Sequence, residues 1–228
     1  MHLFLTDRIT CPRCGPEFGL ILLAHQVQER RVIQGEFGCA NCREQYPVEE
    51  GFGDLRIPPR TALDELPPPA TGPVTEAELG DPQGAVRMAA LLGVTEGPGT
   101  LLFTGPMAAL AGSVVDLIGG VEAVAVDPSQ RGAEGRKGVS RLVSSPGLPF
   151  FSATFKGVVV SGVPGKAWLA EAARVLAPKC RMVVLDAAED TEKELETDGF
   201  QTILHEGGIL VAQKGTGEVV PLVPLRRP

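Results

Sequence analysis

Four cysteines in two C-x-x-C pairs constrain this chain more than any other feature. The pairs are Cys11 and Cys14 in C-P-R-C, and Cys39 and Cys42 in C-A-N-C. Each pair presents two thiolates from one tight turn, and two facing turns form a tetrahedral sulfur site. Zn²⁺ suits such a site because it has no redox chemistry and accepts four soft ligands. The predicted zinc is structural, since no open position remains for catalysis, and it would supply ~10 kcal/mol or more of folding free energy.

Two other interpretations are a redox-active C-x-x-C motif and four unrelated thiols. One isolated pair would leave both open, whereas two pairs at this separation favour zinc. The spacing also suits a metal better than a disulfide framework, so we expect a reducing, cytoplasmic setting. The first residues lack the basic segment and apolar core of a signal peptide. No apolar stretch reaches the roughly 20 residues that a membrane-spanning helix needs.

The net charge of −7 argues against a general affinity for nucleic acid or anionic membranes. It leaves a local contact with nucleic acid open, but the longest basic runs are only Arg30-Arg31 and Arg226-Arg227. We therefore expect no membrane partner.

The chain divides into four zones. Residues 1–57 hold the cysteines and short β-like runs, and residues 58–74 form a linker in which proline is too dense for a regular helix or a central strand. Residues 75–216 alternate between apolar strands and helices, and residues 217–228 form a tail. Continuous apolar strands separated by helices predict an α/β fold, in which a mostly parallel sheet is covered on both faces. The last two strands form a hairpin that turns at Gly207-Gly208 and adds an antiparallel strand.

The elements of the third zone can be placed by their patterns. We expect strands at 100–105, 122–129, 140–145, 156–162 and 181–187, and the hairpin at 201–214. We expect helices at 76–94, 109–120, 166–177 and 191–200. The first helix is predicted to bury Val86, Ala89, Ala90 and Leu92 on one side.

The run CANCREQYPVEEGFGDLR resembles a family of zinc ribbons whose members activate or accompany tRNA and protein methyltransferases. The matching residues, within a resemblance over about residues 3–57, are Tyr46, Pro47, Val48, Glu50, Gly51 and Leu55. The resemblance implies a structural metal and a ribbon surface that contacts a partner, such as a methyltransferase. Tyr46 and Pro47 are expected to pack in the ribbon's small core.

Residues 79–214 resemble the class I S-adenosylmethionine-dependent methyltransferase fold, which is Rossmann-like. The order of elements matches over the whole zone. The positions that carry the resemblance are Leu148-Pro149-Phe150, Phe155, Arg174-Val175-Leu176 and Pro178. The resemblance implies a seven-stranded sheet and a cofactor site at the ends of its first strands.

Two features that hold the cofactor in this family can be located after the first two strands. The first is a glycine-rich turn, in which absent side chains let the cofactor approach the backbone. Here Gly105 is present, but Met107 and Ala109 stand where further glycines are expected, and Phe103 replaces an acidic residue. The second is a carboxylate for the ribose hydroxyls, and Asp127 is suitably placed. Aspartate before proline is also a common strand-ending turn residue, so structural and cofactor roles of Asp127 both stay open.

Two further features are changed. After the third strand, Ser144-Ser145-Pro146 occupies the place of a residue near the adenine, without a carboxylate. The aspartate that begins the fourth strand is here Lys156. Most cofactor contacts are thus altered while packing positions keep their character. No catalytic residue can be assigned: after the fourth strand the chain offers only Ser161, Gly162, Pro164 and Gly165, and Trp168 is expected to pack.

Two hypotheses follow. In the first, side chains fill the cofactor groove, and the chain is a non-catalytic, zinc-stabilised scaffold that binds a partner. In the second, it is a working S-adenosylmethionine-dependent methyltransferase with an atypical pocket that uses Gly105 and Asp127. A pocket for another small ligand is a third possibility without specific support. The first hypothesis is favoured by the altered glycine turn, although fold is a poor guide to chemistry.

Overall fold

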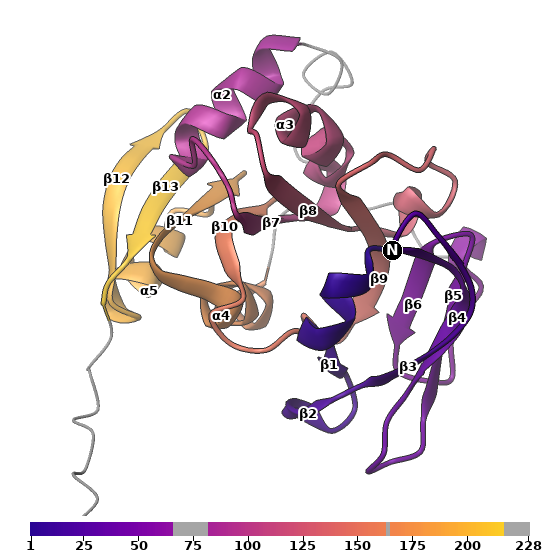
Figure 1. Cartoon of the computed structure of the whole chain (residues 1–228). Coiled ribbons are helices and arrows are strands. Elements are labelled where there is room, and N and C mark those ends of the chain that lie inside the picture. Colours follow the sequence, from indigo (N-terminus) through magenta and orange to yellow (C-terminus); the bar gives the residue numbers. More distant parts are fainter. Residues whose placement is uncertain (66–81, 163–164, 217–228) are drawn as a thin grey trace, which may run out of the picture.

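The computed structural model describes residues 1–65, 82–162 and 165–216. An 11-stranded sheet dominates it, with the order β12-β13-β11-β10-β7-β8-β9-β6-β5-β4-β3 (Figure 1). The strands of this sheet are β3 (Ile21–Gln28), β4 (Arg31–Gly38), β5 (Gln45–Glu49), β6 (Phe52–Arg56), β7 (Gly99–Thr104), β8 (Val121–Val126), β9 (Val139–Ser145), β10 (Phe155–Val160), β11 (Leu176–Leu185), β12 (Phe200–Glu206) and β13 (Ile209–Lys214). A separate two-stranded sheet pairs β1 (Thr10–Cys11) with β2 (Gly15–Gly19).

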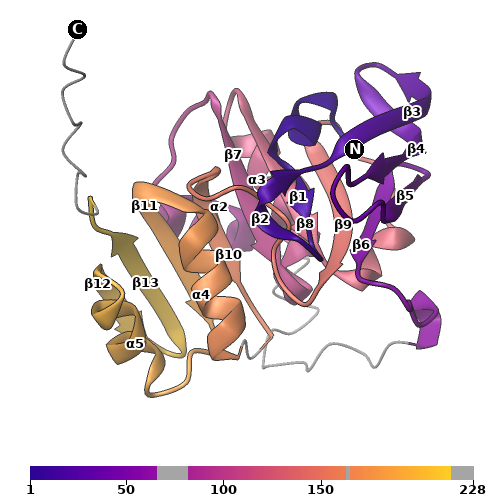
Figure 2. The same ribbon diagram turned by 90° about the horizontal axis from the view of Figure 1, so that it is seen from below.

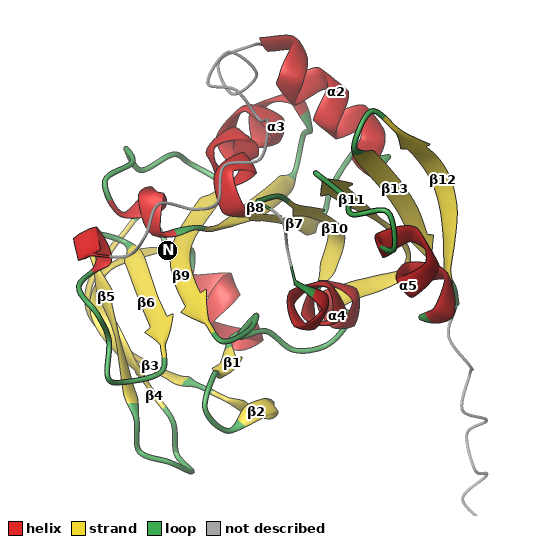
Figure 3. Cartoon of the chain, turned by 180° about the vertical axis from the view of Figure 1, so that it is seen from behind, coloured by secondary structure: helices red, strands yellow, loops and turns green. Residues whose placement is uncertain are grey.

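Helices lie on both faces of the large sheet (Figure 3). The α-helices are α2 (Pro82–Leu92), α3 (Ala111–Leu117), α4 (Lys166–Val175) and α5 (Thr191–Thr197). The short 3₁₀ helices are η1 (Leu3–Arg8), η2 (Leu63–Glu65), η3 (Gly105–Leu110) and η4 (Pro128–Arg131). Most of the predicted linker, the start of the first predicted helix and the tail lie outside the described residues.

The part of the sheet from β7 to β13 confirms the predicted α/β, Rossmann-like methyltransferase fold. Strands β9, β8, β7, β10 and β11 are parallel neighbours, which is the 3-2-1-4-5 order of a doubly wound sheet. Strand β13 then runs antiparallel to both β11 and β12. The hairpin turn falls at Gly207 and Gly208, which both have positive φ, as predicted.

Two layers of core cover the faces of the sheet. Side chains alternate along each strand, so Leu101 and Phe103 face α2 and α3, whereas Leu102 faces α4. On the first face α2 buries Ala85, Met88 and Leu92, while Val86 is 56% exposed. The predicted burial of Leu92 is confirmed and Ala89 packs partly against this core, whereas the predicted burial of Val86 and Ala90 is wrong. A short helix with several small apolar residues does not define its buried face from the sequence alone.

The cysteine-containing part of the chain continues the same sheet. Strand β6 pairs in parallel with β9, and β5, β4 and β3 follow as an antiparallel extension (Figure 2). Its buried side chains, among them Phe37 and Leu55, belong to one cluster with Leu142 and Phe150 of the larger part. Residues 1–57 are thus joined to the rest through hydrogen bonds and a common core, and not only through the covalent linker.

The Leu-Pro-Phe segment is held by one arginine. Arg174 of α4 donates to the carbonyl oxygens of Phe150 (2.6 Å) and Leu148 (2.8 Å), and to both carboxylate oxygens of Glu171. Glu171 also accepts the amide N–H of Leu148. This network explains why arginine stands at this place, and the hydrogen bonds from Arg174 lower the pKa of Glu171.

We expect the Glu171→Gln substitution to destabilise the chain by about 1–3 kcal/mol near pH 7, because it removes charged hydrogen bonds. The pKa of Glu171 is lower in the folded state, so its stabilisation is full above the unfolded value of about 4.3 and disappears as pH falls through the folded value. Urea unfolding at a series of pH values measures this. The difference between the two proteins should shrink below about pH 4, whereas exposed Glu196→Gln should show little difference at any pH. A constant difference across the series would contradict the assignment.

Among the helices that the structure describes, none has the length and apolar character needed to cross a membrane.

Candidate metal centre and ligand cavity

The four predicted zinc ligands come together. Cys11 ends β1 and Cys14 lies in the turn after it, while Cys39 and Cys42 lie between β4 and β5. Their four Sγ atoms are within 4.8 Å of one another. The Cys11–Cys42 and Cys14–Cys39 Sγ separations are 3.7 and 3.8 Å. Zn–S bonds of about 2.3 Å in a tetrahedron would place sulfurs about 3.8 Å apart, so this arrangement could bind a zinc ion.

Donors around the sulfurs suit thiolate ligands. The amide N–H of Cys14 points to the Sγ of Cys11 at 3.4 Å, and the Asn41 side-chain amide donates to the Sγ of Cys14 at 3.3 Å. The buried hydroxyl of Tyr46 lies 3.5 Å from the Sγ of Cys11. Hydrogen bonds of this kind orient metal ligands and tune their charge.

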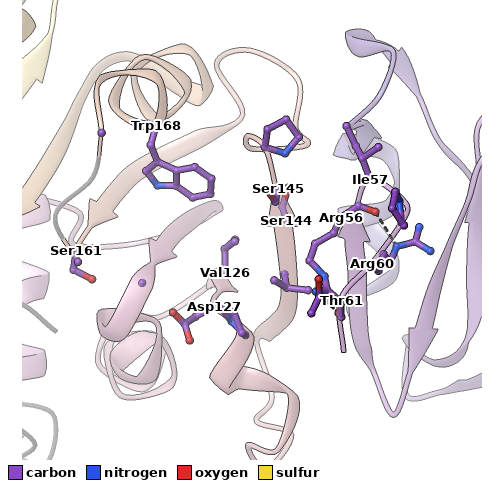
Figure 4. A pocket seen from close by; sticks show the side chains of 17 residues that line it. Arg56, Ile57, Arg60, Thr61, Val126, Asp127, Ser144, Ser145, Ser161 and Trp168 are labelled. Carbon is purple, nitrogen blue, oxygen red and sulfur yellow. Dashed lines mark hydrogen bonds between the residues drawn. The ribbon is translucent and has the colours of Figure 1, made fainter. Parts of the chain in front are cut away.

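A cavity of about 620 Å³ opens at the carboxyl ends of the parallel strands (Figure 4). It adjoins the ends of β7, β8, β9 and β10, and the start of α4. The sheet order reverses between β7 and β10, and ligands of doubly wound sheets bind at such a switch point. The volume lies within the range of small-molecule sites, about 300–1,000 Å³.

The predicted cofactor residues meet at this cavity. Gly105 and Asp127 line it, together with Ser144 and Ser145 after the third parallel strand. Lys156, at the start of β10, is exposed and is not among the lining residues. The expected replacement of a fourth cofactor residue by Lys156 therefore has no consequence for the cavity.

Asp127 is fixed with one oxygen available. Its Oδ1 accepts the Ser129 amide N–H at 2.9 Å and the Ser129 hydroxyl at 2.5 Å. Both bonds fall on Oδ1, so within the described part of the chain Oδ2 is available to a ligand. The residue is only 3% exposed, so the protein encloses most of it. Structural and ligand-binding roles are compatible, since each would use a different oxygen.

Gly105 is needed where two strands end side by side. Its φ is +70°, and a Cβ atom there would lie 2.3 Å from the carbonyl oxygen of Ser161. The Ser161 hydroxyl donates to the carbonyl of Thr104 at 2.7 Å and accepts the amide N–H of Met107 at 3.1 Å. Glycine is therefore explained by packing, whether or not a ligand is bound.

The predicted filling of the groove is wrong. The chain after Gly105 forms η3, which turns Met107 into the core beneath α2, and Ala109 is exposed. Phe103 is fully buried in the same core. None of these three residues lines the cavity. The sequence comparison assumed that the loop after Gly105 has the extended shape usual in this family. The sequence alone did not show that this loop forms a 3₁₀ helix.

The sequence interpretation also missed part of the lining. Trp168, expected only to pack, lines the cavity, and its indole N–H donates to the Thr104 hydroxyl at 3.4 Å. The opposite wall is formed by the last residue of β6 and the segment after it: Arg56, Ile57, Pro59, Arg60 and Thr61. We call these residues the ribbon wall. Of these residues, Pro59, Arg60 and Thr61 fall in the predicted proline-rich linker. No local sequence pattern indicates that β6 pairs with β9.

No family model and no curated protein matches this chain. Several solved structures are similar to it. A precorrin-6y C5,15-methyltransferase from Geobacter metallireducens is 14% identical, with 58% of this chain and 88% of that chain covered and a TM-score of 0.42. A tRNA (m1A58) methyltransferase from Aquifex aeolicus is 16% identical, with 68% and 76% covered and a TM-score of 0.44. A geranyl diphosphate methyltransferase in complex with S-adenosylmethionine is 12% identical, with 64% and 97% covered and a TM-score of 0.46.

These likenesses are distant, and they decide nothing about the chemistry of this chain. The strand order and the geometry of the cavity carry the functional argument instead.

Proposed function

We propose that this chain is a zinc-stabilised, methyltransferase-like protein that binds S-adenosylmethionine and its product S-adenosylhomocysteine in the cavity beside Asp127. The observation that carries the proposal is the open cavity at the switch point with a fixed carboxylate in its wall. The zinc would lie in the cluster of four cysteines, away from this cavity, and would have no catalytic role.

The lining suits a nucleoside. The available Oδ2 of Asp127 can accept hydrogen bonds from ribose hydroxyls, and carboxylates form the stronger class of such bonds. The indole of Trp168 offers an apolar surface on one side. Ser144 and Ser145 offer polar groups toward the β9 end, where the base would lie once the ribose is at β8.

The lining also limits which methyl transfers are possible. Bound S-adenosylmethionine would supply an electrophilic methyl group, and the chain would hold it in position and shield it from water. Asp127 is the only carboxylate among the described lining residues, and they include neither histidine nor lysine. Because Asp127 would be engaged by the ribose, the chain offers no evident general base. We therefore propose an acceptor that is already nucleophilic without losing a proton to the protein.

Calorimetric titration with S-adenosylhomocysteine tests this proposal. We expect one molecule to bind per chain with a micromolar dissociation constant, and to raise the melting temperature as a ligand of the native state. Adenine alone, which lacks the ribose, should bind much more weakly. Absence of both binding heat and thermal stabilisation at millimolar ligand would overturn the proposal.

The second candidate function is a non-catalytic scaffold that binds a protein partner. It is favoured by β3, the edge strand of the sheet, on which Ile21, Leu23 and Val27 are 65%, 56% and 48% exposed. An exposed apolar edge strand can add a strand from another protein. The opposite edge of the ribbon, β6, is already paired with β9 of the same chain.

The substitution Leu23→Lys tests the scaffold function. It should prevent capture of a partner that wild-type protein binds, because a charge on the edge opposes strand addition. Val86→Lys, at an equally exposed apolar position on α2, is the matched control and should leave capture intact. Light scattering and pull-down followed by mass spectrometry measure this. A partner retained equally by both variants would contradict a role for β3.

A further inference from the structure

The ribbon wall stands at the end of the cavity that a nucleoside base would occupy. The parallel pairing of β6 with β9 places Leu55 opposite Ser144 and Arg56 opposite Ser145. The amide N–H of Ile57 then donates to the Ser145 carbonyl at 3.3 Å. In the order β7-β8-β9-β6 the wall lies beyond Asp127, on the side away from Gly105. Figure 4 shows the wall facing Trp168 across the cavity.

Arg60 is a firmly held side chain of this wall, and it connects the wall to the ribbon. Its Nε donates to the carbonyl oxygen of Arg56 at 2.8 Å, and its Nη2 donates to that of Gln45 at 2.8 Å. The guanidinium also lies 5.2 Å from the centre of the Tyr46 ring, within the range of a cation–π contact. The side chain is only 22% exposed. Backbone and ring together therefore fix its position.

Tyr46 connects this arginine to the cysteines. Its side chain is fully buried, and its hydroxyl lies 3.5 Å from the Sγ of Cys11. A continuous path of contacts thus runs from the cluster of four cysteines, through the tyrosine ring, to Arg60 and the cavity. The path contains only packed or hydrogen-bonded groups, and chains of such contacts can carry coupling between two sites.

We infer that Arg60 is a positioning residue for the base of the nucleoside, and that zinc and nucleoside binding stabilise each other through Tyr46 and Arg60. The identity of the ligand in this inference rests on the proposed function. A metal held by Cys11 would fix the Tyr46 hydroxyl, and the ring would hold Arg60. Through its bond to the Arg56 carbonyl, Arg60 would in turn hold the wall that the base contacts. Linkage requires the effect to be reciprocal, so a bound nucleoside must also retain the metal.

Two measurements on zinc-loaded protein in the presence of S-adenosylhomocysteine test the inference: the rate of zinc transfer and the affinity for the ligand. S-adenosylhomocysteine should slow the transfer of zinc to a chromogenic chelator in wild type. Arg60→Gln should keep one zinc per chain, bind S-adenosylhomocysteine about threefold to tenfold more weakly, and lose the slowing, because it removes the cation–π contact with Tyr46. Arg136→Gln, which changes an exposed arginine outside the cavity lining, should behave as wild type.

A third measurement needs no ligand. Trp168 is the single tryptophan of the chain and faces the ribbon wall. Acrylamide should quench its fluorescence more strongly in zinc-loaded Arg60→Gln and Tyr46→Phe than in wild type, since each substitution cuts the path that holds the wall. Arg136→Gln should show no increase.

The outcomes separate the inference from the proposed function. If S-adenosylhomocysteine binds wild type, but Arg60→Gln retains wild-type affinity and slowing, the inference is overturned and the proposed function stands. If no binding occurs but quenching rises in both path variants, the proposed function fails, and positioning of the wall by the cysteine cluster is supported. Unchanged quenching in both variants overturns the inference in either case.

Discussion

The Cys39→Ser variant is expected to lose its zinc and to melt at least about 10 °C below wild type. Structural zinc sites contribute about 10–16 kcal/mol to the folding of small modules, and loss of one thiolate should forfeit several kcal/mol of this. For a chain of this size, each kcal/mol corresponds to about 2–4 °C in melting temperature. Zinc content after dialysis and differential scanning calorimetry measure the two effects.

The whole chain should respond because the ribbon is part of the main sheet. Strand β6 pairs with β9, and Phe37 and Tyr46 belong to the same buried cluster as Leu142 and Phe150. We therefore expect one broad or shifted transition, and not the independent melting of a small module. Removal of zinc with a chelator should reproduce the effect in wild type.

The fifth cysteine provides the matched control. Cys180 lies on β11, outside the cluster of four, so Cys180→Ser should retain one zinc per chain and melt within a few degrees of wild type. A Cys39→Ser protein with unchanged zinc content would contradict the metal site. Loss of zinc with an unchanged melting transition would contradict its coupling to the main sheet.

The second large effect is expected for Asp127→Asn. The asparagine can still accept the Ser129 amide N–H through its carbonyl oxygen, so the fold should persist. It loses the charge that would bind the ribose hydroxyls, and hydrogen bonds to charged groups are worth about 1.5–3 kcal/mol. The dissociation constant for S-adenosylhomocysteine should therefore rise about 10-fold to 100-fold. Calorimetry at pH 7 measures this rise.

The Ser129→Ala variant separates orientation of the Asp127 carboxylate by Ser129 from direct binding of the ligand by that carboxylate. It removes the hydroxyl that donates to Oδ1 but keeps the backbone N–H bond and the carboxylate. We expect a smaller loss of affinity than for Asp127→Asn. Equal affinity of Asp127→Asn and wild type would assign Asp127 to the strand-ending turn alone, the structural role that its position before Pro128 also suggests.

The order and type of the elements followed from local patterns. Apolar β-branched runs predicted the parallel strands, two glycines predicted the hairpin turn, and the paired cysteines predicted the cluster. Each signal is carried by neighbouring residues, so it does not depend on the rest of the fold.

The features that were missed depend on contacts between distant segments. The parallel pairing of β6 with β9 brings Arg56 beside Ser145, and no local pattern specifies which edges of two sheets will meet. The direction of Met107 depends on the coiling of η3 and on the core beneath α2. The role of Trp168 depends on a cavity formed by several strand ends. The sequence interpretation therefore identified Gly105 and Asp127 but misjudged the space around them.

The central claim is that the cavity holds a nucleoside with its ribose at Asp127. The most direct measurement is a crystal structure of the zinc-loaded chain grown with S-adenosylhomocysteine. We predict density for the ligand between Trp168 and the ribbon wall, with a ribose hydroxyl within hydrogen-bonding distance of the Asp127 Oδ2. An empty cavity in crystals grown at saturating ligand, or a ligand bound elsewhere, would contradict the claim.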